Sequence, residues 1–186
     1  MRELTTFTLV PFEPLPTAVD LSITGTLTRE DNLLTLSYLM AGDIDAVALP
    51  AFSTTDTRQD RLWEQTCFEF FLTASAKKSD QAPYWEFNLS PTGAWNVFAL
   101  DGYRQGLREE LAFTQLPFSV RRSSEGLRLD ASIDLSGLDL SDSQWLLGVS
   151  TVCVLTGGEE TFWAIAHPGP QADFHSAGSF AIQLSP

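Results

Sequence analysis

The amino-acid sequence predicts a single antiparallel, all-β domain, a β-sandwich of about nine or ten strands. Apolar residues make up 44% of the 186 residues, which is enough for the core of one ordinary domain. Short runs of β-branched and aromatic residues recur between turn signals, and helical periodicity is nearly absent. Because no repeat and no glycine or proline block marks a boundary, we expect one domain over residues 1–186.

Two hairpins are the clearest elements, because each has two alternating runs on either side of a polar turn. Their strands are expected at residues 19–23 and 34–38, with a turn at 29–32, and at residues 118–122 and 127–133, with a turn at 123–126.

The remaining strands are short apolar runs, also bounded by turn residues. They are expected at residues 67–72, 84–90, 94–100, 145–155, 161–166 and 180–184. Residues 105–110 are the one segment expected to form a helical turn.

Two central strands place polar side chains on one face. In the strand 67–72, successive side chains alternate faces, so the Glu69 side chain points to the face opposite that of the phenylalanines on either side of it. In the strand 84–90, Glu86 and Asn88 share a face in the same way. We therefore expect these three polar side chains on a common surface of the sheet.

The register between these strands decides which side chains meet. If Leu72 pairs with Pro83, Glu69 lies directly opposite Glu86, about 5 Å away across the sheet. Two carboxylates at that distance repel, so a partner must offset the repulsion. An arginine such as Arg104 or Arg61, a bound cation, a shared proton or the hydroxyl groups of a ligand could do so.

Aromatic residues flank this polar face. Trp63 precedes the first strand, Trp95 follows the second, Tyr103 comes after a turn, and Trp163 lies on a late strand. Flat rings beside carboxylate and amide acceptors suit a pyranose, which offers an apolar C–H face and donating hydroxyl groups. The combination indicates a sugar or polyol site, although for any single tryptophan a place in the core is the more common outcome.

The charge balance of the chain argues against nucleic acid and anionic membranes as partners. The formal net charge is −13, and only 11 basic residues are scattered along the chain. Nucleic acid and anionic membrane surfaces are therefore not expected partners.

The first residues lack the apolar core of a secretory signal, so we expect a soluble, cytoplasmic protein. Cys67 and Cys153 lie in apolar runs and are expected as buried free thiols.

The succession of these segments resembles the DOMON-like and carbohydrate-binding-module family 9 (CBM9)-like β-sandwiches. The resemblance rests on residues 63–72, on residues 84–95 and on residues 129–152, and it covers roughly residues 60–184 in order. It implies a sandwich with an immunoglobulin-like or jelly-roll-like arrangement that binds a sugar without catalysis. Some DOMON domains bind haem through methionine and histidine, but Met40 is the only internal methionine here, so no haem is expected.

The resemblance also implies roles for particular residues. Trp63 matches the first stacking tryptophan of the CBM9 modules, Glu69 matches their acidic hydrogen-bonding residue, and Asn88 matches their amide. Glu86 departs from the pattern, because those modules usually carry a basic residue there. The second stacking ring could be Trp163, Phe174 or His175.

A histidine-containing loop near the carboxyl end adds candidates. His167 and His175 lie in a proline-rich segment that we expect to close over the end of the sandwich, with an imidazole at the rim of the site. With Asp173 they could instead bind a metal, but their spacing matches no well-defined site. No cofactor is expected, although calcium could bind the acidic pair.

Two other function classes compete with a binding module. Retaining glycosidases hold two carboxyl groups about 5–5.5 Å apart, which the Glu69/Glu86 pair could match. Alternatively, the polar face could be an ionic network in a structural or protein-interaction domain. The residues expected to bind ligand are Trp63, Glu69, Glu86, Asn88, Trp95, Tyr103, Arg104, Trp163, His167 and His175.

Overall fold

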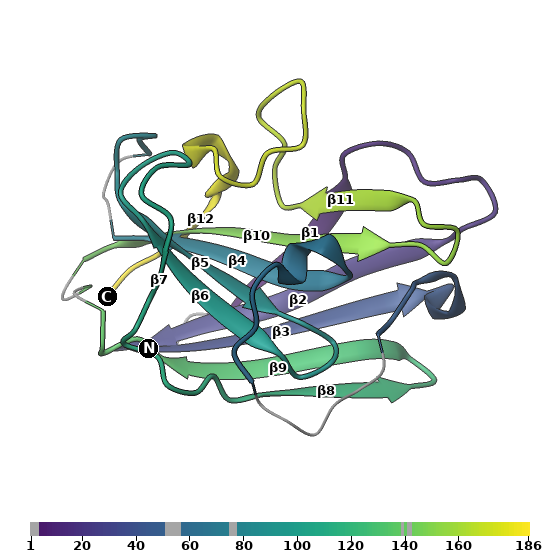
Figure 1. Cartoon of the computed structure of the whole chain (residues 1–186), viewed down its shortest axis with the longest axis horizontal. Coiled ribbons are helices and arrows are strands. Elements are labelled where there is room, and N and C mark those ends of the chain that lie inside the picture. Colours follow the sequence, from purple (N-terminus) through teal and green to yellow (C-terminus); the bar gives the residue numbers. More distant parts are fainter. Residues whose placement is uncertain (1–3, 51–56, 75–77, 139, 141–142) are drawn as a thin grey trace.

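The computed structural model describes residues 4–50, 57–74, 78–138, 140 and 143–186, and the regular secondary structure of this part of the chain is nearly all β-strand (Figure 1). The strands are β1 (Leu4–Pro11), β2 (Leu21–Glu30), β3 (Leu33–Gly42), β4 (Cys67–Thr73), β5 (Tyr84–Leu89), β6 (Trp95–Leu100), β7 (Arg108–Glu109), β8 (Phe118–Ser123), β9 (Gly126–Asp134), β10 (Trp145–Val154), β11 (Glu160–Ala164) and β12 (Ile182–Leu184). The helices among the described residues are three single 3-10 turns, η1 (Ile44–Ala46), η2 (Leu62–Glu64) and η3 (Ala177–Ser179). None of these turns is long and apolar enough to span a membrane.

The strands form two layers, which confirms the predicted sandwich (Figure 1). One layer has the order β1-β2-β3-β9-β8, and the other has the order β7-β6-β5-β4-β10-β11, with β12 paired to the start of β10. All pairings between these strands are antiparallel. The first part of β1 pairs with β2 and its last residues pair with β11, so β1 joins the two layers.

Both hairpins predicted from alternation are present. β2 pairs with β3 along the whole of both strands, and β8 pairs with β9 around the turn at residues 123–126. In the first hairpin, β2 begins two residues later than predicted, at Leu21, but both strands run further than predicted at their other ends. Threonine, glycine and arginine continue the ladder of β2 to Glu30, and β3 extends to Gly42.

Two strands were not expected. β1 is too polar for its apolar positions to stand out, since Phe7 and Leu9 are its only buried side chains. The expected helical turn at residues 105–110 is wrong. In its place, a tight turn bridges Gly102 and Gln105, and Arg108–Glu109 then pair with β6 as the edge strand β7.

The main core fills the space between the layers. The layer that contains β4, β5 and β10, called the upper layer from its place in Figure 1, contributes Phe68, Phe70 and Phe87 to this core. The layer that contains β2, β3 and β9, called the lower layer, contributes Leu36 and Tyr38. The outer face of the lower layer is more polar, as expected for a sheet that faces water on one side.

The upper layer departs from that pattern, because its outer face is also largely covered. All seven side chains of β4 are buried, including those that point away from the main core. A second apolar cluster lies on this outer face, made of Phe71, Tyr84, Phe98, Leu100, Leu146, Val152, Ala164, Phe174 and Phe180. The segment that follows β11 covers part of this cluster, and the candidate site lies beside it.

Candidate functional site

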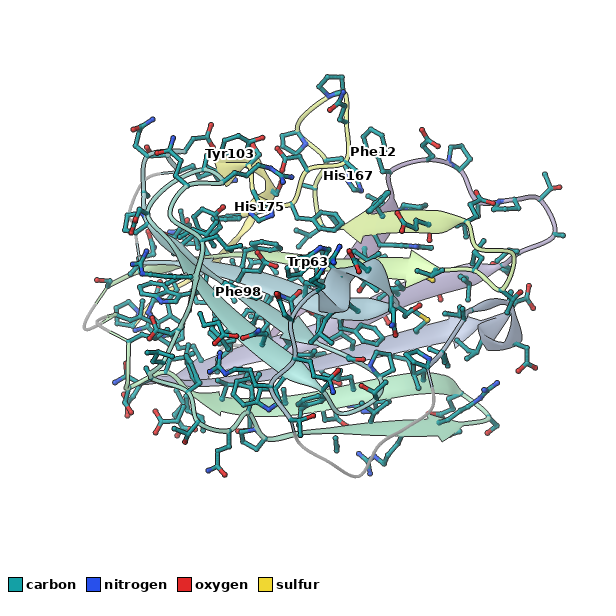
Figure 2. The ribbon with its side chains drawn as sticks, in the orientation of Figure 1. Phe12, Trp63, Phe98, Tyr103, His167 and His175 are labelled. Atoms are coloured by element: carbon teal, nitrogen blue, oxygen red, sulfur yellow. The ribbon has the colours of Figure 1, made fainter. Side chains whose placement is uncertain are left out.

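The outer face of the upper layer carries a pocket with a volume of about 550 Å³. Its aromatic lining comes from Trp63 in η2, Phe71 in β4, Phe162 in β11 and Phe174 in the following loop. Figure 2 shows Trp63 and His175 over this same layer, although they come from segments far apart in the chain. The polar lining includes Glu69, Glu86, Arg104 and His175.

The predicted register between the two central strands is wrong by two residues. In the structure Glu69 pairs with Asn88, and Glu86 pairs with Phe71. Because side chains alternate with a period of two, a slip of two residues keeps every side chain on its expected face. Glu69 and Glu86 therefore still share the pocket face, but they are diagonal neighbours and not a directly opposed pair.

Glu69 is a nearly unpaired buried carboxyl group. It is 2% exposed, and its Oε2 accepts only a long hydrogen bond of 3.5 Å from the Ser150 hydroxyl. Its Oε1 has no hydrogen-bond partner among the described residues. Burial, and then the charge of Glu86, raise the pKa of Glu69 well above its ordinary value.

Glu86 is better satisfied. Its Oε1 accepts a hydrogen bond of 2.8 Å from the Asn88 amide, whose oxygen in turn accepts one from the Cys67 thiol. Burial raises the pKa of Glu86, while the Asn88 hydrogen bond and the charge of Arg104 oppose that shift. Asn88 is fully buried and does not line the pocket, so it positions Glu86 and does not reach a ligand.

His175 lies over Glu86 as a neutral donor. Its Nδ1 is 2.8 Å from the hydroxyl of Tyr84, which accepts a hydrogen bond from the Arg104 backbone N–H and can give its own proton to Nδ1. Burial, and then the charge of Arg104, lower the pKa of His175 to about 4, so the ring is neutral at pH 7. Its proton is then on Nε2, 3.9 Å from the Glu86 carboxylate, which is beyond direct hydrogen-bonding distance.

Arg104 does not pair with the two glutamates as expected. Its guanidinium forms an ion pair with Asp173 at 3.0 Å, and the Tyr103 hydroxyl donates to the other oxygen of the same carboxylate at 2.7 Å. Asp173 also accepts from the His175 backbone N–H. Although partial burial opposes it, these hydrogen bonds lower the pKa of Asp173. Asp173 thus ties the loop after β11 to the turn after β6, and Tyr103 belongs to this tie and not to the pocket lining.

Trp63 is held by a short turn. Leu62 anchors η2 in a small cluster with Cys67 and Ala94, and Arg61 begins the turn with a left-handed backbone. This geometry leaves Trp63 on the outer face, edge-on to Phe98 with ring centroids 5.7 Å apart.

Besides Asn88 and Tyr103, three further predicted residues lie outside the pocket lining: Trp95, Trp163 and His167. Trp95 and Trp163 point into the core between the layers, because their positions on β6 and β11 have inward parity. His167 packs edge-on against Phe12 and its Nε2 lies 2.9 Å from the Val10 carbonyl oxygen (Figure 2). The ring that lines the pocket from β11 is Phe162, which the sequence analysis missed. The sequence offered one signal for it: Phe162 is the neighbour of Trp163, so the two side chains must point to opposite faces of the strand.

The described residues hold no group of three or more histidine, cysteine, aspartate or glutamate side chains placed to bind a metal ion. In particular, the proposed histidine loop separates its two imidazoles: His175 contacts Tyr84, and His167 contacts Phe12. Cys67 and Cys153 are buried and free, as predicted.

The burial of Glu69 leads to a first testable prediction, which concerns stability. Its pKa is raised in the folded chain, so between the unfolded value of about 4.3 and the folded value the folded chain binds more protons, and stability falls as pH rises. Glu69→Gln removes this effect. We expect the variant to be more stable than the unchanged protein at pH 7 by more than about 1 kcal/mol, and equal to it near pH 4.

Urea unfolding at pH 4, 5.5 and 7 measures this difference. Glu125→Gln, in the exposed turn between β8 and β9, is the matched control and should have no such pH-dependent effect. A Glu69→Gln variant that is less stable at pH 7 would contradict the account.

These features define a class of protein: a two-layer β-sandwich with an open, aromatic and acidic pocket on the outer face of one sheet. Among solved structures, the chain is similar to a "putative carbohydrate-binding protein" from Bacteroides uniformis, with a TM-score of 0.71 and 13% identity over 98% of this chain and 85% of that one. It is also similar to a CBM9 from Caldicellulosiruptor kristjanssonii in complex with glucose, with a TM-score of 0.52 and 11% identity over 89% of this chain and 76% of that one. The complex of a CBM9 from the same organism with cellotriose gives a TM-score of 0.51 and 11% identity, over 87% and 72% of the two chains.

The fold is therefore that of a CBM9-like β-sandwich, as the sequence predicted. The resemblance to DOMON domains stays a prediction. No family model and no curated protein sequence matches the chain.

Proposed function

We propose that this chain is a non-catalytic carbohydrate-binding module whose ligand occupies the pocket on the upper layer. The observation that carries the proposal is the lining of that pocket, in which the rings of Trp63, Phe162 and Phe174 surround the carboxyl groups of Glu69 and Glu86. The fold shared with structures that hold glucose and cellotriose supports it.

The lining provides both kinds of contact that a pyranose needs. The C–H face of the sugar packs on an aromatic ring, for which Trp63 is the best placed because it is only partly buried. The sugar hydroxyl groups donate to Glu69 and Glu86, and the Nε2–H of His175 donates to a sugar oxygen. The Oε1 atom of Glu69 thereby gains the partner that it lacks in the free protein.

A second hollow extends the site. It is lined by Phe12, Pro14 and other residues, and it shares Glu160, Phe162 and Ala172 with the main pocket. We infer that a ligand longer than one sugar ring runs toward Phe12 along this surface.

Calorimetric titration with monosaccharides and disaccharides tests the proposal. We expect Trp63→Ala to weaken binding about tenfold or more, because it removes the ring on which the sugar stacks. Trp63→Phe should recover part of the affinity. Calorimetry is preferable to fluorescence here, since the substitution also removes the tryptophan nearest to the ligand.

Leu111→Ala is the control, because this side chain is 77% exposed and lies outside the pocket. It should leave the affinity unchanged. The proposal fails if no sugar binds to the unchanged protein, or if Trp63→Ala binds sugar as tightly as Leu111→Ala does.

One observation favours hydrolysis as a second candidate. Burial raises the pKa of Glu69 strongly, whereas Asn88 and Arg104 restrain the pKa of Glu86. Two carboxyl groups with different pKa values can serve as the acid and the nucleophile of a glycosidase. Turnover of aryl glycosides that is lost in Glu69→Gln would replace the binding proposal, and no turnover across the panel would remove hydrolysis.

A further inference from the structure

The floor of the pocket carries two acidic side chains with incomplete partners. Glu69 is 2% exposed and Glu86 is 5% exposed, and both line the cavity. Within the described part of the chain, the Oε1 atom of Glu69 is buried without a hydrogen bond, and its Oε2 has only the long contact to Ser150. The Oε2 atom of Glu86 lies 3.9 Å from the nearest imidazole nitrogen, which is too far for a hydrogen bond. Buried polar atoms in proteins are normally hydrogen-bonded, so these carboxyl oxygens need hydrogen-bond donors.

No arginine or lysine among the described lining residues forms an ion pair with these two glutamates. Arg104 carries the one full positive charge among the described residues that line the pocket, and its guanidinium is engaged with Asp173. His175 is neutral at pH 7, because burial lowers its pKa to about 4. At the rim, Glu160 adds further negative charge, whereas the Glu64 carboxylate is paired with Arg61.

We propose that the ligand is an amino sugar, whose protonated amino group is directed at Glu69 and Glu86 while its ring packs on the aromatic lining. This inference rests on the proposed function and names the class of sugar. An ammonium group has three N–H donors and no acceptor, so it suits a site that offers carboxyl oxygens without partners. A hydrogen bond between an ammonium and a carboxylate is about twice as strong as one between neutral groups.

The overall charge favours the same ligand. With a net charge of −13 and the acidic side chain of Glu160 at the rim, the protein attracts cations toward the pocket. A calcium ion fits less well, because it takes six to eight oxygen ligands and the floor supplies two carboxyl groups. The described residues contain no cluster of three metal-binding side chains at this place or elsewhere.

The test compares glucosamine with glucose and with N-acetylglucosamine, which has the same ring but no positive charge. Titration calorimetry at pH 6.5 with the full chain should give an affinity for glucosamine at least tenfold higher than for N-acetylglucosamine. Glu69→Gln should reduce this ratio to about one, whereas Glu125→Gln, the same charge change in an exposed turn, should leave it unchanged. Circular dichroism confirms that both variants are folded.

The outcomes separate this inference from the proposed function. If all three sugars bind equally, the amino-sugar inference is overturned and the carbohydrate-binding proposal stands. If no sugar binds, the proposed function itself fails. Methylammonium binding as tightly as glucosamine would overturn the sugar part of the inference, and calcium binding that Glu69→Gln abolishes would identify a cation site in its place.

Discussion

Gly25→Ala is expected to lower the free energy of unfolding by about 4 kcal/mol, near the upper end for a single substitution. An added Cβ atom would lie 2.1 Å from the carbonyl oxygen of Ser37 and 2.3 Å from the ring of Phe7. The first clash is with the backbone of the neighbouring strand, so a change of side-chain rotamer cannot relieve it. The paired strands must separate or the ring must leave the core.

The damage would extend toward the site. Phe7, which covers Gly25 from β1, packs edge-on against Tyr38, and the Tyr38 hydroxyl donates a hydrogen bond of 2.6 Å to the backbone carbonyl of Glu69. A displaced Phe7 therefore disturbs the residue that supports the pocket floor from behind. Urea unfolding measures the loss of stability.

Gly157→Ala is the matched control, since nothing lies within 4 Å of an added Cβ there. It should change the free energy of unfolding by less than about 0.5 kcal/mol. Equal stability of the two variants would show that the strands around Gly25 relax at little cost, contrary to our account.

Arg58→Met is expected to lower the free energy of unfolding by about 3 kcal/mol, because it leaves several partly buried acceptors without a donor. The Arg58 guanidinium donates to the Asn96 side chain at 2.7 Å and to the carbonyl oxygens of Glu110 and Phe113 at 3.0 and 2.6 Å. It also lies over the Trp95 ring, 4.5 Å from the ring centre. One side chain thus joins the segment before η2 to β6 and to the chain beyond β7.

Arg108→Met is the control for this prediction. Arg108 pairs with Asp101 at the surface, where both side chains are more than half exposed, and surface pairs contribute little. Loss of this ion pair should lower the free energy of unfolding by less than about 1 kcal/mol. Comparable losses in the two variants would mean that the partly buried contacts of Arg58 contribute no more than a surface ion pair does.

The fold class could be predicted from the sequence because strand periodicity is a local property. The alternation in β2, β3, β8 and β9 follows from the covalent geometry of an extended chain, and it assigns faces without any knowledge of partners. The helical turn expected at residues 105–110 was wrong for a related reason: the strand found there has two residues, which is too short to show a period.

The candidate site could be predicted only in part. Glu69, Glu86 and Asn88 were assigned to one face correctly, because an error of two residues in register preserves parity. Trp95 and Trp163 were mistaken for site residues, because alternation separates two faces of a strand without saying which one faces the core. Arg104 was assigned to the acidic pair by its closeness in sequence, whereas its partner is Asp173, distant in sequence and brought near by the fold.

The sequence by itself determined the all-β class, most of the strands and the polar face that carries Glu69 and Glu86. Only the tertiary structure decided how that face is used. The upper layer bears an aromatic pocket because η2 and the loop after β11 fold over its outer side, bringing Trp63, Phe174 and His175 above the two carboxyl groups. Contacts between segments so far apart in the chain depend on how the two layers pack, and no local pattern in the sequence encodes them.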